Sequence, residues 1–231
     1  MNIVLTGAAD GLGKEIALLL KDHNLILVDY AEAKLKEVAK QVKSKQKYVC
    51  DLTSVEDVEN TTAKILNKNK KIDVVINCAG AWLNEATEQD LNKFRRMILV
   101  NMFGTIAFTK CLLPRLIEQK DGFIININSQ AGVHPEAGSP VYSATKAGLI
   151  AYRKAIKKDL GNNGIKITDI HPGMIETGLF QKAGVEFPQA AFDNFSLKKA
   201  DVASVVKWLI DQPSYVSIPA LEIKNRNENL N

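Results

Sequence analysis

Short apolar segments alternate with amphipathic helical segments along almost the whole chain, and this alternation constrains the fold most. The segments expected as strands are residues 2–7, 24–30, 47–52, 72–80, 122–129, 165–173 and 219–225. The segments expected as helices are residues 11–23, 31–44, 54–68, 91–119, 140–160 and 200–211. The strands are apolar throughout, which is typical of parallel strands buried on both faces. Right-handed crossovers then predict an α/β fold with a doubly wound parallel sheet and helices on both faces.

A single domain is the simplest organisation for this sequence. Its 231 residues suit one domain of ordinary size. We see no internal repeat and no linker rich in Pro, Gly or Ser, so we predict one domain over residues 1–231. Residues 178–199 are the least periodic stretch. They are predicted as a substrate loop, which could be a mobile lid or simply an irregular surface segment.

Charge and cysteine usage exclude several classes of protein. The net charge of +4 comes mostly from lysines spread over helical segments, without the Arg and Lys clusters and interleaved aromatics of a nucleic-acid surface. The sequence has no run of 18 apolar residues, and Asp10, Lys14 and Glu15 argue against a signal peptide. The three cysteines are far apart, which favours free thiols of a reducing, cytoplasmic compartment over disulfides or a metal site.

A glycine-rich turn, "TGAADGLG" at residues 6–13, joins the first strand to the first helix. Gly7, Gly11 and Gly13 allow a tight turn and close approach of a ligand. The free N–H groups at the start of the helix behind them favour a diphosphate. The spacing differs from the usual G-x-G-x-x-G pattern, and such glycines could also just end a strand.

Asp29 supports a dinucleotide ligand. It ends the second strand, 22 residues after Gly7, where a carboxylate can accept hydrogen bonds from the ribose hydroxyls of adenosine. Asp10 adds a second negative charge, and no Arg or Lys stands at either place to pair with a 2′-phosphate. We therefore predict NAD rather than NADP. The alternative is that Asp29 only caps the helix beginning at Ala31.

Tyr142 and Lys146 lie four residues apart, in "PVYSATKAG", and so share one helix face. The pKa of a tyrosine hydroxyl is ordinarily near 10, too high for efficient proton transfer at neutral pH. A neighbouring ammonium lowers that pKa and fits the tyrosine to act as a general acid or base. The small residues around the pair leave room for a ligand. Without other context, an ordinary exposed tyrosine and lysine would be an equally good interpretation.

Five motifs supply that context. "TGAADGLG", "NCAG" (77–80), "NINSQAG" (126–132), "YSATK" (142–146) and "HPGMIETG" (171–178) stand in an order and spacing that resemble the short-chain dehydrogenase/reductase family. The resemblance covers nearly the whole chain. It implies a Rossmann-like fold, an oxidoreductase activity and a nicotinamide dinucleotide cofactor.

The resemblance also implies roles for individual residues. Ser129 would hydrogen-bond the substrate oxygen, and Tyr142 would give or take the proton. Lys146 would lower the tyrosine pKa and bind the nicotinamide ribose, while Asn101 would hold a water that links Lys146 to a proton relay. The implied cofactor-binding residues are Thr6, Gly7, Asp10, Gly11, Leu12, Gly13, Asp29, Tyr30, Asp51, Leu52, Asn77, Ala79, Gly80, Tyr142, Lys146, Pro172, Gly173, Ile175 and Thr177.

The sequence departs from the family pattern at two places near these motifs. Cys78 replaces the second asparagine of "NNAG", and Asn128 replaces the first serine of a "SS" pair. Neither touches the four proposed catalytic positions. The chain is also rather short between "PGMIET" and the last strand, where members of the family usually build substrate specificity.

The substrate is less well constrained than the cofactor. The residues expected near it are Trp82, Gln130, His134, Met174 and Phe180, although each could instead be core or loop packing. This set contains no arginine, so a carboxylate or phosphate clamp is not indicated. We expect a small or medium secondary alcohol and its ketone. The alternatives are an NADP(H)-dependent carbonyl reductase of the same fold and a non-catalytic dinucleotide-binding sensor.

Self-association is a further expectation. Residues 91–119 and 140–160 carry more apolar surface than one sheet face needs. In the family such helices form subunit contacts, which predicts a homodimer or homotetramer. We expect no membrane or nucleic-acid partner.

Overall fold

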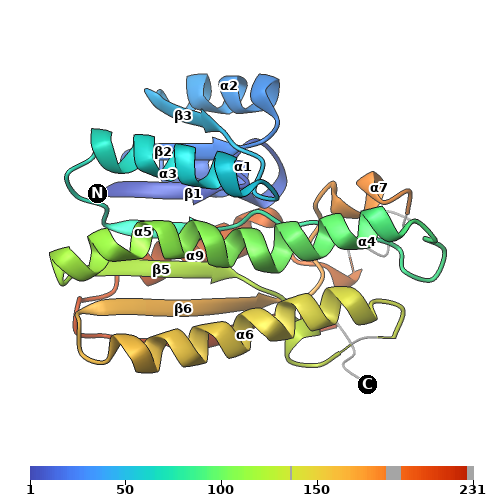
Figure 1. Cartoon of the computed structure of the whole chain (residues 1–231). Coiled ribbons are helices and arrows are strands. Elements are labelled where there is room, and N and C mark those ends of the chain that lie inside the picture. Colours follow the sequence, from blue (N-terminus) through green and yellow to red (C-terminus); the bar gives the residue numbers. More distant parts are fainter. Residues whose placement is uncertain (136, 186–193, 228–231) are drawn as a thin grey trace.

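A seven-stranded parallel sheet forms the centre of the protein in the computed structural model, which describes residues 1–135, 137–185 and 194–227 (Figure 1). The strand order is β3-β2-β1-β4-β5-β6-β7, and every neighbouring pair is parallel. The strands are β1 (Asn2–Thr6), β2 (Asn24–Asp29), β3 (Gln46–Val49), β4 (Val74–Asn77), β5 (Gly122–Ile127), β6 (Ile165–Pro172) and β7 (Ala220–Ile223). The predicted doubly wound parallel sheet is confirmed.

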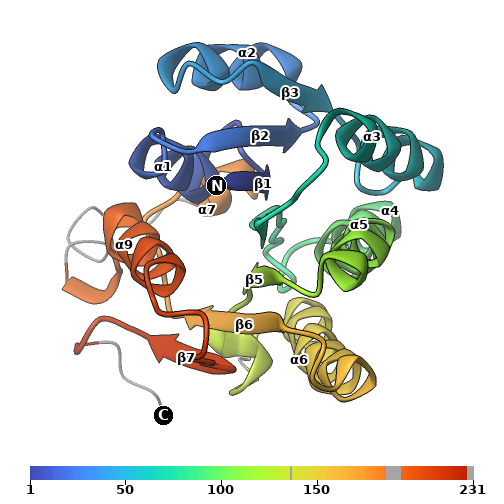
Figure 2. The ribbon, with the colours of Figure 1, turned by 90° about the vertical axis from the view of Figure 1, so that its left-hand side faces the viewer.

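Helices cover both faces of the sheet. They are α1 (Gly11–Leu19), α2 (Glu32–Gln41), α3 (Val55–Lys68), α4 (Leu91–Ile98), η1 (Leu99–Gly104), α5 (Thr105–Gln119), η2 (Gln130–Gly132), α6 (Pro140–Leu160), α7 (Leu179–Lys182) and α9 (Lys199–Ile210). Figure 2 shows α3, α5 and α6 on one face and α1 and α9 on the other. The strand order reverses between β1 and β4, which is where ligands bind in open α/β sheets.

Alternate residues of the strands are buried in two separate hydrophobic cores, one on each face of the sheet. In β1, Ile3 and Leu5 pack with α1, α2 and α9, whereas Val4 packs with α3 and α5. All three side chains are fully buried. The continuous apolar strands of the sequence are therefore explained by burial on both faces.

Most predicted elements are present, with shorter ends. Ser54 caps α3, because its hydroxyl accepts a hydrogen bond from the Asp57 amide at 3.1 Å. The predicted helix 31–44 ends at Gln41, and Lys43 takes a left-handed conformation with φ of 54°. The predicted helix 11–23 ends at Leu19, ahead of the turn into β2. Helical periodicity continued past both ends, whereas the hydrogen bonding did not.

The long predicted helix 91–119 contains a π-helical segment, η1, which the sequence did not indicate. Such a bulge shifts the register of the side chains that follow it. By length and composition alone, Leu91–Gln119 could cross a membrane. Here it serves as one of the sheet's covering helices, with Phe108, Leu112 and Leu116 fully buried.

A row of buried polar side chains crosses the sheet beneath the site. Asn77, Asn126 and Asp169 are register partners on β4, β5 and β6. The Asn77 amide donates to Asn126, and the Asn126 amide donates to Asp169, both at 2.9 Å. Arg153 of α6 completes the row with a 2.9 Å ion pair to Asp169. Burial raises the pKa of Asp169 despite the opposing effects of Asn126 and Arg153.

Candidate active site

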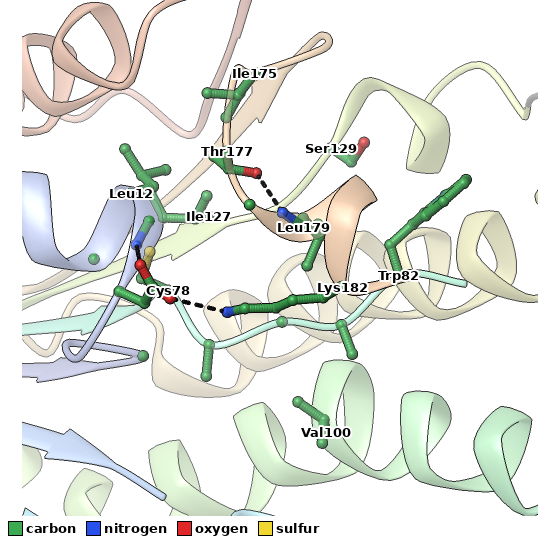
Figure 3. A pocket seen from close by; sticks show the side chains of 18 of the residues that line it. Leu12, Cys78, Trp82, Val100, Ile127, Ser129, Ile175, Thr177, Leu179 and Lys182 are labelled. Atoms are coloured by element: carbon green, nitrogen blue, oxygen red, sulfur yellow. Dashed lines mark hydrogen bonds and ion pairs between the residues drawn. The ribbon is translucent and has the colours of Figure 1, made fainter. Parts of the chain in front are cut away.

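A cleft of about 840 Å³ opens at the carboxyl ends of the strands. Its lining includes residues that follow β1, β4, β5 and β6, together with α7 and the residues before it. Its size is within the range of small-molecule and cofactor sites. Figure 3 shows Leu12 and Cys78 on one side of the cleft and Ser129 and Trp82 toward the other.

The glycine turn is packed as a phosphate cradle requires. A Cβ atom on Gly13 would lie 2.0 Å from the Gly7 carbonyl oxygen, so no larger residue fits there. Gly7 and Gly11 have φ values of 70° and 53°, which disfavour other residues. Asp10 caps α1 by accepting a 2.7 Å hydrogen bond from the Gly11 amide. The residues present therefore fit the diphosphate of a dinucleotide.

Asp29 connects the glycine turn to the start of α2. One carboxylate oxygen accepts from the Ala9 amide at 3.0 Å, and the other accepts from the Ala31 amide at 2.9 Å. Ala31 is the cap residue of α2 and that helix has no side-chain cap hydrogen bond, so the capping alternative expected from the sequence is wrong. The bond to the Ala31 amide instead gives Asp29 a structural role in the turn that precedes α2. Each carboxylate oxygen has a further lone pair, so this role leaves Asp29 able to accept from a ribose hydroxyl as well.

Several cations lie at the end of the cleft where Asp29 is predicted to bind the adenosine ribose, called the adenosine end below. This corrects the prediction that no Arg or Lys stands there to pair with a phosphate. Lys34 and Lys182 both pair with Asp10, at 2.7 and 3.2 Å. The hydrogen bond from Lys34 is the main reason that the pKa of Asp10 is lowered. Arg96 of α4 lies 3.3 Å from Asp51 and 5.9 Å from the centre of the Tyr30 ring. No cation stands beside Asp29 in sequence, but the fold brings three to this end.

Lys146 is the buried cation of the opposite end. Its Nζ donates to the Ile127 carbonyl at 3.3 Å and lies 5.6 Å from the centre of the Tyr142 ring. The residue is only 4% exposed, and burial lowers the pKa of its ammonium to about 8. At neutral pH the group is charged and close to the tyrosine, which is the arrangement the sequence motif predicted.

Ser129 follows β5 at the edge of the same cleft. Its hydroxyl accepts a 3.2 Å hydrogen bond from the Ala131 amide, which fixes the η2 turn behind it. A Cβ on Gly132 would lie 2.8 Å from the Lys146 carbonyl carbon. Gly132 thereby allows the serine turn to pack directly on the helix that carries Tyr142 and Lys146.

Asn101 lies in η1 and is completely buried. Its Oδ1 accepts from the Ala81 amide at 2.7 Å, and its Nδ2 donates to the Ala81 carbonyl at 2.8 Å. The side chain therefore holds the start of the loop that follows β4. The link to a proton relay implied by the resemblance stays a prediction.

The cleft brings together most, but not all, of the predicted site residues. Those that line it are Gly7, Asp10, Gly11, Leu12, Gly13, Asp29, Tyr30, Asp51, Leu52, Ala79, Gly80, Trp82, Ser129, Tyr142, Lys146, Pro172, Gly173, Met174, Ile175, Thr177 and Phe180. Five lie outside the lining: Thr6, Asn77, Asn101, Gln130 and His134.

The five exceptions have structural explanations, and that of Asn101 is its pair of hydrogen bonds with Ala81. Thr6 accepts from the Cys78 amide at 3.2 Å, and Asn77 belongs to the polar row beneath the site. Gln130 is 1% exposed and buried within the η2 turn, so it cannot meet a substrate directly. His134 faces Glu222 at 3.7 Å on the surface. Proximity to Ser129 in sequence suggested substrate contact for both, but the turn directs them elsewhere.

An aromatic pair forms the wall at the catalytic end. Trp82 and Phe180 pack edge to face with their ring centres 4.9 Å apart. The Trp82 indole donates to the Ser139 hydroxyl at 3.2 Å. The sequence reading missed further lining residues here, among them Asn84, Ala86, Ala137, Gly138, Ser139 and Leu179. Nothing local marks them, because their loops meet only in the fold.

Known proteins resemble this chain over its full length. The family model described as short chain dehydrogenase matches residues 1–186. A Staphylococcus epidermidis protein named as an uncharacterized oxidoreductase is 32% identical over 225 residues, covering 96% of this chain and 95% of that protein. A Staphylococcus aureus protein with the same description is also 32% identical, over 229 residues and with the same coverage.

Two solved structures are also similar to this chain. The closed form of serine dehydrogenase complexed with NADP⁺ is 27% identical, with a TM-score of 0.90 over 100% of this chain and 97% of that one. Serine dehydrogenase from Escherichia coli is also 27% identical, with a TM-score of 0.86 and full coverage of both chains. With the glycine turn, the Tyr142–Lys146 pair and Ser129 gathered in one cleft, these matches show that the chain belongs to the short-chain dehydrogenase/reductase family and is an oxidoreductase.

Proposed function

We propose that this protein is an NAD-dependent oxidoreductase that interconverts a secondary alcohol and its ketone, with Tyr142 as general acid and base. The observation that carries the proposal is the buried Lys146 ammonium, 5.6 Å from the Tyr142 ring centre in the same cleft as Ser129. When bound, the cofactor supplies or accepts the hydride. The residues that would hold it are the glycine turn, Asp29 and the cleft residues after β4 and β6.

The protein's own groups manage the proton and the substrate oxygen. In reduction, the Tyr142 hydroxyl gives its proton to the carbonyl oxygen, and the Ser129 hydroxyl hydrogen-bonds the same oxygen. The Lys146 ammonium stabilises the phenolate that remains. In oxidation, the phenolate takes the proton of the alcohol. A non-catalytic dinucleotide-binding sensor is the weaker hypothesis, since a sensor would need neither the tyrosine nor its lysine.

The lining around the aromatic wall favours an uncharged, apolar substrate. The apolar side chains of Trp82, Met174 and Phe180 line the cleft here. Residues 186–193, which lie outside the described residues, contain no Lys or Arg. A carboxylate such as that of serine, the substrate named for the similar structures, would find no arginine clamp among the described residues of this wall. We therefore expect a neutral ketone with an apolar side group.

NAD remains the proposed cofactor, and NADP is the runner-up. Asp29 favours NAD because a carboxylate at the end of β2 repels a 2′-phosphate. Two observations support NADP: Lys34 and Arg96 line the adenosine end, and the serine dehydrogenase structure is an NADP⁺ complex. Lys34 and Arg96 are already paired with Asp10 and Asp51, which weakens their claim on a phosphate.

The proposal is tested by a panel of neutral ketones and secondary alcohols, followed through NADH absorbance. Tyr142→Phe should lower kcat at least about a hundredfold on any substrate found, because it removes one acid–base group. NADH binding, measured by fluorescence titration, should stay nearly intact. A Tyr142→Phe enzyme with wild-type turnover would overturn the assignment of the proton donor.

Three further expectations stay predictions. Light scattering at micromolar concentration would test the homodimer or homotetramer. The cytoplasmic location rests on cysteine usage. The predicted substrate loop, residues 178–199, includes α7 at the cleft, but its part from 186 to 193 lies outside the described residues.

A further inference from the structure

The helix that carries Tyr142 is capped by a side chain from a distant loop. Both carboxylate oxygens of Glu85 accept hydrogen bonds from backbone amides of α6, one from Val141 and one from Tyr142 itself, each at 2.8 Å. Glu85 precedes these residues by 56 and 57 positions. A carboxylate at a helix N-terminus also interacts favourably with the helix dipole.

Glu85 supplies what the helix lacks locally. The residue in the cap position, Ser139, makes no side-chain cap hydrogen bond to α6, and its hydroxyl accepts from the Trp82 indole. Pro140, in the first turn, has no N–H. The next two amides are those that Glu85 binds, and the Ser143 amide already bonds the Ser139 carbonyl at 2.9 Å. Without Glu85, two amides beside the catalytic tyrosine would lose their partners.

Glu85 also belongs to a short strap, residues 81–85, that borders the cleft. The strap is held at its start by the two hydrogen bonds between Asn101 and Ala81. It is held in the middle by Trp82 and Ser139, and at its end by Glu85 and α6. The strap thus joins the π-helical segment, the aromatic wall and the first turn of the catalytic helix.

We propose that Glu85 is a positioning residue that sets the place of Tyr142 relative to the Trp82 wall. Glu85 is not among the residues that line the cleft, so it acts through the backbone of α6 rather than on the substrate. Because Tyr142 lies in the first turn, a helix end that frays moves the tyrosine directly. Lys146, one turn further on, stays in the regular part of the helix. The inference rests on the proposed role of Tyr142.

The test is Glu85→Gln, with Glu88→Gln as its matched control. Glu88 lies in the same loop, but among the described residues its carboxylate binds its neighbours: the amides of Gln89 and Asp90 and the Lys93 side chain. The rate is expressed per NADH-binding site, counted by fluorescence titration, so that unfolded protein does not enter the comparison. The substrate is the best ketone of the panel described above.

We expect Glu85→Gln to lower kcat per binding site by about 10- to 100-fold, because a displacement of about 1 Å can cost 10²-fold. The Kd for NADH should change little, since Glu85 does not line the cofactor cleft. Glu85→Asp, which keeps the charge, should recover part of the loss. Glu88→Gln should retain kcat.

A kcat per binding site for Glu85→Gln equal to that of Glu88→Gln would overturn the proposal. A purely structural role would give this result, with fewer folded sites of normal activity. Failure of the proposed function is distinguishable, because Tyr142→Phe would then stay active. If Tyr142→Phe is inactive and Glu85→Gln is fully active, only the positioning role is wrong.

Discussion

The two ends of the cleft handle charge in opposite ways. At the adenosine end, the side chains of Asp10, Lys34 and Lys182 are 42%, 57% and 55% exposed, and they form ion pairs in contact with water. At the catalytic end, Lys146 is 4% exposed and Asn101 is fully buried. Water screens exposed pairs, whereas burial strengthens both the interactions and their cost. We therefore expect substitutions at the catalytic end to have the larger effects.

The largest effect on activity in this comparison should come from Lys146→Met. Removing the ammonium takes away the positive charge that stabilises the Tyr142 phenolate, so kcat/KM should fall at least about a hundredfold. Steady-state kinetics at saturating NADH would show it. Loss of less than about tenfold would mean that the buried charge does not activate the tyrosine.

The same substitution should raise the stability of the cofactor-free enzyme. Burial lowers the pKa of Lys146 from 10.5 to about 8. At neutral pH the buried ammonium therefore destabilises the folded state by about 3 kcal/mol. Between pH 8 and 10.5 the unfolded state binds more protons, and the cost disappears as the pH rises. The free energy of unfolding of Lys146→Met, measured by denaturant titration, should exceed the wild-type value most below about pH 8. An equal gain at about pH 7 and about pH 10 would contradict this linkage.

An intermediate effect should come from Asp29→Asn, which keeps a hydrogen-bond acceptor for the Ala9 or Ala31 amide but removes the charge. Loss of charged hydrogen bonds to the ribose should raise the Kd for NADH about tenfold or more. The Kd for NADPH should fall, because repulsion of the 2′-phosphate is relieved. Fluorescence titration of both cofactors checks the ratio of the two Kd values. A wild-type enzyme that binds NADPH more tightly than NADH would reject the NAD assignment.

The contrast between the two ends also marks what the sequence could predict. Tyr142 and Lys146 can be recognised by their helical spacing, and Ser129 by its place in a family motif that stands in register with theirs. The parallel, doubly wound sheet follows from alternation and handedness alone. Arg96 pairs with Asp51 across 45 positions, and Glu85 reaches α6 across 56. No local pattern encodes such pairs, because they depend on how loops of particular length meet.

Gln130 shows the reverse error. Its position directly after Ser129 suggested contact with the substrate, yet it is 1% exposed. The η2 turn, fixed by the bond from the Ala131 amide to Ser129, folds the residue inward. In the same way, the π-helical segment is hidden in an apparently regular helix, although it holds Asn101 against Ala81. In both regions a polar residue next to a motif suggested a site residue. The backbone conformation of η1 and η2 determines which side chains reach the cleft.

The smallest effect should come from Lys182→Gln at the exposed end. Lys182 of α7 forms a 3.2 Å ion pair with Asp10. Figure 3 shows the Lys182 side chain extended within the cleft. Exposed ion pairs contribute about 0–1 kcal/mol, so the Kd for NADH should rise no more than about fivefold, and less at high salt. Asp10 keeps its pairing with Lys34 in the variant, which limits the loss further. Titration at two salt concentrations measures this. A salt-independent loss greater than about tenfold would show that this ion pair is far stronger than its exposure allows, and would remove the distinction between the two ends.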